Sequence, residues 1–176
     1  MIWRGCAAKR TGAKLTCDPL RTKTSSAGSS ARLVIRYLLD TNIVSEPAGP
    51  DPSEAVLTRL RRRSREVALP SVAWHELTYG AERMDEGRRR SYLVEYIHEV
   101  VRPSMPVLPY DTTAAQWHGW ARATLEEKGL STPFADGQIA AIAATEDLVV
   151  VTQNVSDFEP FATLEDGIRL ENWFSD

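Results

Sequence analysis

The chain is predicted to be an α/β protein, a three-layer α/β/α sandwich with a mostly parallel central sheet. Short apolar runs that suit buried strands alternate along the sequence with longer segments of helical periodicity. One of these runs, LVVVTQ at Leu148–Gln153, is rich in β-branched residues, as in strands covered on both faces. Strands that alternate with helices favour a parallel sheet with helices on both sides.

In the first half of the chain, the apolar strand Leu33–Leu39 ends at a carboxylate, Asp40. The turn-rich run PAGPDP separates a short helix from a longer one, for which Asp51 or Ser53 is the expected cap with Pro52 in the first turn. The elements expected here are, in order, Leu33–Leu39, Thr41–Ser45, Glu54–Arg65, Glu66–Leu69, Ser71–Met84 and Arg88–Val101.

In the second half, Gly129 is a natural end for the amphipathic helix Thr112–Lys128. Thr132 is expected to cap the next helix, with Pro133 at its first position. The elements expected here are a strand at Pro106–Tyr110, the helix Thr112–Lys128, a helix from Pro133 to about Thr145, the strand Leu148–Gln153 and a last short strand in IRLENW.

Residues 1–33 differ in composition from the rest of the chain. They are rich in Lys, Arg, Ser, Thr, Gly and Ala, with linker-like TSSAGSSA at Thr24–Ala31 and no persistent helical or strand period. We therefore expect a disordered N-terminal extension at residues 1–33, outside a folded domain at residues 34–176. An organellar transit peptide, or sequence upstream of a natural start near Val34, would each account for this composition.

Charge is unevenly distributed along the chain. Residues 1–36 contain eight Lys or Arg and one Asp, a net charge of +7, while the whole chain carries −3, so the other 140 residues carry −10. A polyanion would bind such an acidic body only at local basic patches or through cations. With no apolar run near the roughly 18 residues of a membrane span, and no cysteine after Cys17, we expect a soluble cytoplasmic protein without a membrane partner.

Asp40 stands at the carboxyl end of an expected parallel strand, where the ligand crevice of such sheets lies. The alternative is that it only caps the following helix. Asp157 and Asn154 lie just beyond the strand Leu148–Gln153, where a turn and a helix cap would also explain them.

Two further acids occupy helix faces that are otherwise apolar or small. The neighbours of Glu76 one turn away include Val72 and Tyr79, so this carboxylate is expected to be largely buried unless it pairs with Arg83. Asp136 begins a helix that is hydrophobic almost all round. A favourable interaction with the helix dipole would explain an acid in the first turn, but not one on the inward face.

Four carboxylates gathered in one crevice raise one another's pKa values, because like charge and desolvation both disfavour ionisation. A divalent cation removes that conflict. Oxygen ligands without clustered His or Cys favour Mg²⁺ or Mn²⁺ over zinc. The chemistry that follows is attack of metal-activated water on a phosphodiester.

The acids lie in four stretches: YLLDTNIVSE, LPSVAWHELTYGAER, FADGQIAAIA and VVVTQNVSDFE. In order and spacing these resemble the motifs of PIN-domain ribonucleases, most closely the VapC/FitB-like toxins of bacterial toxin–antitoxin pairs. The resemblance runs from about Val34 to Phe174. It does not include the N-terminal extension.

The resemblance implies a PIN-like fold and a Mg²⁺- or Mn²⁺-dependent endoribonuclease that hydrolyses RNA, is inhibited by a cognate antitoxin protein and forms homodimers. It implies Asp40 and Asp136 as direct metal ligands, with the other two acids binding directly or through water. The implied catalytic and metal-binding residues are Asp40, Glu76, Asp136 and Asp157, and the implied supporting residues are Thr41, Asn42, Thr152 and Asn154.

Two alternatives remain beside this prediction. Haloacid-dehalogenase-like phosphatases also begin with an Asp at a strand end, but they need a second Asp where Asn42 stands. A catalytically inactive PIN-like module that binds RNA or protein usually lacks one or more of the acids, whereas this chain keeps all four.

The arginine-rich run Arg59–Arg65 is interpreted as a solvated helix face in preference to an RNA contact. The three histidines are expected to be structural or solvated.

Overall fold

The computed structural model describes residues 34–175, so the expected disorder of residues 1–33 lies outside the described part. Five strands form one sheet in the order β3-β2-β1-β4-β5, and every pairing is parallel. This confirms the predicted parallel sheet. The strands are β1 (Tyr37–Leu39), β2 (Val67–Pro70), β3 (Val107–Leu108), β4 (Val149–Val151) and β5 (Arg169–Glu171).

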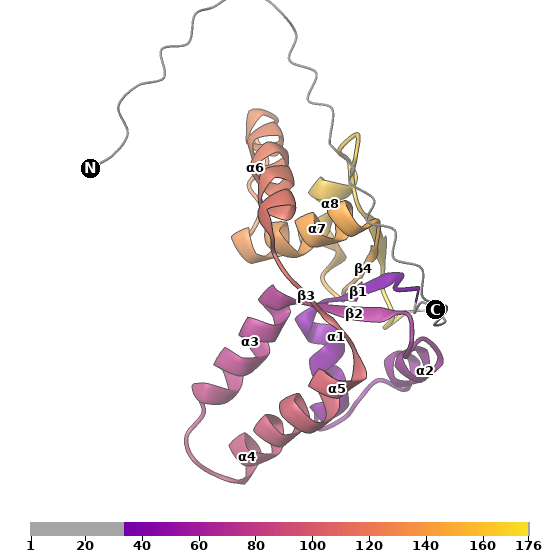
Figure 1. Ribbon diagram of the computed structural model, residues 1–176, viewed down its shortest axis with the longest axis vertical. Helices are drawn as coiled ribbons and strands as arrows, with labels where there is room; N and C mark the ends of the chain where they lie inside the picture. The colour runs from indigo at the N-terminus through magenta and orange to yellow at the C-terminus, as the bar shows by residue number, and fades with distance from the viewer. Residues whose placement is uncertain (1–33, 176) are drawn as a thin grey trace, which may run out of the picture. The chain divides into compact units, whose positions relative to one another are not determined.

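Helices lie on both sides of this sheet, as the predicted three-layer sandwich requires. Figure 1 shows α6, α7 and α8 on one side of the strands and α1, α3 and α5 on the other. The helical segments are α1 (Thr41–Ser45), η1 (Glu46–Ala48), α2 (Glu54–Arg62), α3 (Ser71–Glu82), α4 (Arg88–Glu95), η2 (Tyr96–Val101), α5 (Arg102–Ser104), α6 (Thr112–Glu127), α7 (Phe134–Glu146) and α8 (Val155–Ala162).

Alternate residues of the central strand feed two separate hydrophobic cores, because successive strand side chains point to opposite faces. Leu38 packs among residues of α6, α7 and α8, including Ile139 and Phe158. Tyr37 and Leu39 pack on the other face among residues of α1, α2 and α3. All three strand residues are buried. The apolar run around β1 therefore sets the position of Asp40, the next residue in the chain.

Several expected boundaries are wrong in detail. The first strand begins only at Tyr37, and Val34, which was expected to lie in it, is 61% exposed. Ser53 caps α2 through the Val56 amide, so Pro52 precedes the cap and does not lie in the first turn. The helix expected at Arg88–Val101 has the expected limits, with α4 followed directly by the π-helical segment η2, so only the helix type of its second half differs.

The α7 boundary also differs. Its N-cap is Pro133, which cannot cap through its side chain, and so Thr132 is not the cap. Helices α6 and α7 approach closely at Gly137, where an added Cβ would lie 2.2 Å from Nε2 of the buried His118. Nδ1 of that histidine lies 3.0 Å from the Tyr110 hydroxyl. Glycine at position 137 is thus a packing requirement.

The strand order changes direction at β1, which has β2 on one side and β4 on the other. In open parallel sheets a crevice forms outside the carboxyl ends of the strands at such a switch point. Asp40 follows β1 directly and Thr152 follows β4 directly. No helix within residues 34–175 has the length and apolar composition needed to cross a membrane.

Candidate functional site

Asp40 is the most deeply buried acid of the expected four, with 7% of its surface exposed. Its Oδ1 accepts a hydrogen bond of 2.7 Å from the Thr41 amide, so it does cap α1 as the alternative interpretation held. Capping occupies only part of the carboxylate, whose Oδ2 accepts from Asn42 and Thr152 at 2.7 Å each. Burial raises the pKa of Asp40, while these hydrogen bonds act in the opposite direction.

Thr152 links the ends of β1 and β4. Its hydroxyl donates to Asp40 Oδ2 and accepts from the Asn42 side chain at 3.2 Å and from the Asn154 amide at 3.0 Å. The Asn42 side-chain carbonyl in turn accepts from the Gln153 amide at 3.1 Å. Because hydrogen bonds from two loops meet on one carboxylate, the orientation of Asp40 depends on both strand ends. The Gln153 contact has no signal in the sequence, since a backbone amide makes it.

Glu76 reaches the same region from α3. The Thr41 hydroxyl donates to Glu76 Oε2, so the residue after Asp40 connects two of the acids. Glu76 is partly buried, in line with the expectation of a carboxylate mostly removed from solvent, while the neighbouring Tyr79 is 53% exposed. Arg83 does not pair with Glu76, since its guanidinium lies over the Tyr79 ring, 5.3 Å from the centroid.

Asp136, in the first turn of α7, shows the strongest electrostatic conflict. Desolvation raises the pKa of Asp136 to about 6, and the charges of Asp40, Asp157 and Glu76 add to that rise. The structure therefore places the four acids, from the end of β1 and from α3, α7 and α8, close enough that three of them raise the pKa of the fourth. A half-buried carboxylate without a cationic partner is costly to ionise, and a bound cation would lower that cost.

Asp157 and Asn154 lie at the start of α8. Asn154 is exposed and its side chain makes no cap hydrogen bond, so the expected turn role of that side chain is wrong. Its backbone carbonyl accepts from the Asp157 amide at 3.1 Å. Asp157 is half-buried in the first turn of an eight-residue helix. Asn154 therefore contributes to the site through its backbone amide, which donates a hydrogen bond to the Thr152 hydroxyl.

The four acids are not arranged as a closed metal cage. Within residues 34–175, no three His, Cys, Asp or Glu side chains are close enough to bind one ion together. Mg²⁺ is usually bound by one or two carboxylates, with water and substrate oxygens as its other ligands. Carboxylates spaced around one buried member fit Mg²⁺ better than zinc. In structural zinc sites, four protein ligands surround the ion and fill every coordination position.

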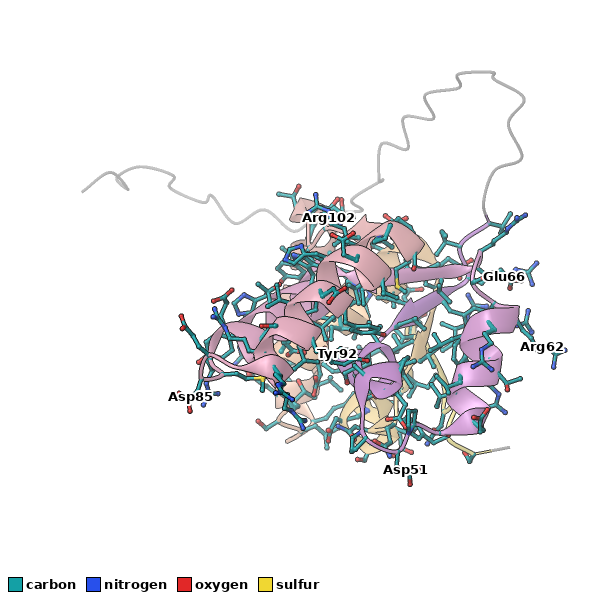
Figure 2. The ribbon with its side chains drawn as sticks, turned by 90° about the horizontal axis from the view of Figure 1, so that it is seen from below. Asp51, Arg62, Glu66, Asp85, Tyr92 and Arg102 are labelled. Atoms are coloured by element: carbon teal, nitrogen blue, oxygen red, sulfur yellow. The ribbon has the colours of Figure 1, made fainter. Side chains whose placement is uncertain are left out.

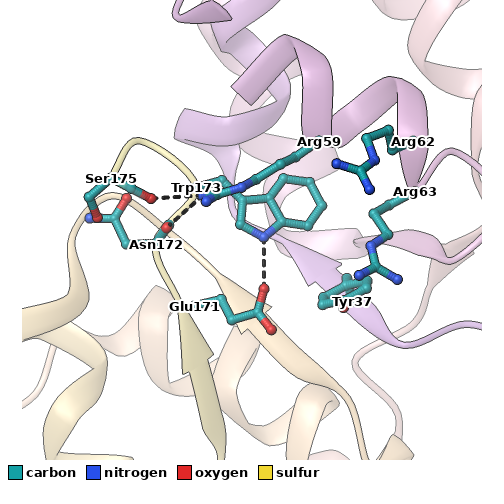
Figure 3. Close-up of a pocket in the computed structure, with 8 residues that line it drawn as sticks. All are labelled: Tyr37, Arg59, Arg62, Arg63, Glu171, Asn172, Trp173 and Ser175. Atoms are coloured by element: carbon teal, nitrogen blue, oxygen red, sulfur yellow. Dashed lines mark hydrogen bonds between the residues drawn. The ribbon is translucent and has the colours of Figure 1, made fainter. Parts of the chain in front are cut away.

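A pocket of about 360 Å³ lies elsewhere, at the amino end of β1. Figure 3 shows that Arg59, Arg62 and Arg63 face Trp173 across it. Arg59 donates to the carbonyls of Asn172 and Ser175 at 3.2 and 2.9 Å. The arginine-rich run is thus only in part a solvated face, since Arg59 holds the C-terminal segment against α2. None of the four acids lines this pocket.

Comparison with known proteins identifies the family. Residues 37–161 match the family model described as "PIN domain". The chain is 34% identical over 141 residues to the tRNA(fMet)-specific endonuclease VapC of Salmonella typhimurium, which covers 80% of this chain and 99% of the relative.

Two solved structures extend this similarity. FitAcB from Neisseria gonorrhoeae has a TM-score of 0.72 at 28% identity and covers 80% of this chain and 99% of that one. VapBC-5 from Mycobacterium tuberculosis, a member of the VapBC family of toxin–antitoxin systems, has a TM-score of 0.57 at 27% identity and covers 78% and 96%. The order of the elements, the matched range and these similarities agree: the chain belongs to the PIN domain family.

Proposed function

We propose that the protein is a divalent-metal-dependent endoribonuclease and the toxin of a toxin–antitoxin pair. The observation that supports this most strongly is the shared field of Asp40, Glu76, Asp136 and Asp157, in which Asp136 has a pKa of about 6. Such a site selects a cation and, through it, a phosphodiester. The similarity to a tRNA(fMet)-specific endonuclease supports RNA as the substrate class.

Asp40 and Asp136 would hold the metal directly, and Glu76 and Asp157 would reach it through water. The bound ion, Mg²⁺ or Mn²⁺, supplies Lewis-acid stabilisation of phosphate charge and lowers the pKa of bound water. Asp40 is fixed for this role by three hydrogen bonds, which leave little freedom in the carboxylate plane. Thr41 orients Glu76, so a change at position 41 would move a second acid.

The protein's own groups also prepare the site for a polyanion. Ionised carboxylates repel RNA, and only their pairing with a cation makes the crevice attractive to a phosphate. Asn42, Thr152 and the Asn154 amide keep Asp40 oriented whether or not substrate is present. These residues position the site, while the acids would carry the reaction.

The partners we propose are RNA and a cognate antitoxin protein. The antitoxin is supported by the similarity to VapBC-5, a member of a toxin–antitoxin family. A homodimer, expected from the family resemblance, stays a prediction. The mass of the purified chain in multi-angle light scattering would test it, and a monomer at all micromolar concentrations would contradict it.

The deciding experiment incubates the purified, antitoxin-free chain with total RNA in Mg²⁺, in Mn²⁺ and in EDTA. Asp40→Asn, purified in parallel, controls for contaminating nuclease. We expect cleavage that needs metal and is absent from the variant. Metal binding in calorimetry without cleavage would point to a narrow substrate absent from the pool. Neither cleavage nor metal binding would overturn the proposal and favour the inactive binding module.

A further inference from the structure

Helix α3 and its C-cap residue carry a row of three planar side chains spaced four residues apart. The rings of His75 and Tyr79 are stacked, with centroids 5.9 Å apart and planes 7° from parallel. The Arg83 guanidinium lies over the same Tyr79 ring, 5.3 Å from its centroid. We call His75, Tyr79 and Arg83 the α3 ladder. The spacing of four residues was visible in the sequence, but it did not reveal that the groups are stacked and exposed.

The α3 ladder faces solvent. Tyr79 is 53% exposed, and both other members are exposed as well. None of its members belongs to either hydrophobic core, and Arg83 takes part in none of the ion pairs formed among residues 34–175. At the adjacent Gly80, which is also exposed, an added Cβ would meet no atom of another element within 4 Å. The α3 ladder therefore has no evident role in stabilising the fold of residues 34–175.

The ladder begins beside a proposed catalytic acid. His75 precedes Glu76 in the chain, and Tyr79 lies one turn further on, on a neighbouring face. Helix α3 starts directly after β2, at the carboxyl edge of the sheet where Asp40 lies, and ends before the turn that holds Asp85 (Figure 2). At 1.5 Å per residue, His75 to Arg83 spans about 12 Å leading away from the site.

We propose that the α3 ladder is a stacking platform for unpaired bases of the RNA next to the scissile phosphate. This rests on the proposed function. Exposed aromatic rings stack on any base, and a guanidinium both stacks and attracts the phosphate backbone. A strand whose phosphate is bound at Glu76 would have its neighbouring nucleotides along α3. The ladder would thus select unpaired RNA, since bases within a duplex cannot reach Tyr79.

The test uses the full chain with Asp136→Asn, so that RNA stays intact, and a short unpaired oligoribonucleotide as the probe. Tyr79→Ala should weaken binding roughly 5- to 150-fold, the range expected for loss of one stacked base. Tyr79→Phe keeps the ring and should bind like the parent. Tyr92→Ala is the matched control, because Tyr92 of α4 is 52% exposed and lies outside the ladder (Figure 2).

A second probe separates stacking from general damage. With the same strand made abasic, Tyr79→Ala should bind as the parent does, because there is no base to stack. If Tyr79→Ala lost the same affinity for the intact and the abasic strand, or lost affinity for neither, the proposed role of the α3 ladder would be overturned. So would a change from dimer to monomer in light scattering that accounts for the loss, since Tyr79 would then contact a second copy of the chain.

The two proposals fail in different ways. If the unmodified chain cleaves RNA in Mg²⁺ but Tyr79→Ala binds the oligoribonucleotide normally, the ladder is wrong and the nuclease stands. If the unmodified chain neither binds nor cleaves RNA, both are wrong. A raised KM for cleavage by Tyr79→Ala, with kcat largely retained, would support the ladder independently of the binding assay.

Discussion

Asp40 and Asp136 carry the same functional group in different surroundings. Hydrogen bonds from Thr41, Asn42 and Thr152 stabilise the charged form of Asp40 and partly offset its burial. Asp136 has no such offset, and desolvation and three like charges raise its pKa to about 6. In the metal-free protein, Asp136 is therefore the acid whose ionisation most opposes folding.

This cost predicts a pH dependence of stability. An Asp whose pKa is higher in the folded than in the unfolded state binds protons more tightly when folded, so stability falls as pH rises from about 4 to about 6. In Mg²⁺, Asp136→Asn should abolish RNA cleavage. In EDTA at pH 7, the same variant should raise the melting temperature by a few degrees. The shift alone corresponds to roughly 3 kcal/mol, and solvent screening reduces it to about 1 kcal/mol.

The measurement is thermal unfolding in EDTA between pH 4 and pH 8, with Asp166→Asn, an exposed acid outside the site, as the control. The slope with pH should flatten in Asp136→Asn only. A lower melting temperature for that variant would show that the Asp136 charge stabilises the fold.

Thr152 offers a second test, because three groups depend on its hydroxyl. Thr152→Val keeps the shape but leaves the buried Asp40 with one donor fewer and the Asn154 amide unpaired. We expect a loss of about 1–3 kcal/mol in the free energy of unfolding, measured in urea, and reduced cleavage. Thr152→Ser retains the hydroxyl and should remain close to the parent. Equal stability of the two variants would contradict the role of this network.

The packing of α6 on α7 positions Asp136, because the acid lies in the first turn of α7 and is followed directly by the contact residue Gly137. His118 fills the space that a larger residue at 137 would need, and its own ring is held by Tyr110. A shift of α7 would move the acid together with the helix. Helix packing and site geometry are therefore coupled at this contact.

Gly137→Ala should destabilise the protein by about 1–3 kcal/mol, because the new methyl group must displace the buried His118 ring. Gly119→Ala, in the exposed face of α6, meets nothing within 4 Å and should stabilise by about 0.5–1 kcal/mol through helix propensity alone. Urea unfolding of both variants makes the comparison. Stabilisation by both would mean that α7 can move away from α6 at little cost.

Among residues 34–175, the two hydrophobic cores draw on residues from Ile35 to Phe174 and already enclose both faces of the central strand. We therefore expect a chain of residues 34–176 to unfold at the same temperature as the full chain and to cleave RNA at the same rate. Differential scanning calorimetry and the cleavage assay, both in Mg²⁺, make the comparison. A clearly lower melting temperature for the shorter chain would show that residues 1–33 contribute to the fold.

The sequence alone determined the class of the fold and the order of its elements, because periodicity and turn residues are local signals. It also placed Asp40 at a strand end, since an apolar run that stops on a polar residue is visible in the chain, whereas Thr152 was expected inside the strand Leu148–Gln153 and instead follows β4. The helix boundaries at Pro52 and Thr132 were wrong, because a cap depends on which backbone amides remain unpaired. That is settled only once the neighbouring segments have packed.

Only the tertiary structure decided how the acids are held and how exposed they are. The contact of Thr41 with Glu76 joins residues 35 positions apart, and that of Asp40 with Thr152 joins residues 112 positions apart. Such contacts follow from strand order and register, which no local pattern specifies. Exposure of Tyr79 likewise depends on which face of α3 the rest of the domain covers. The sequence therefore predicted the chemistry of the site, and packing decided its geometry.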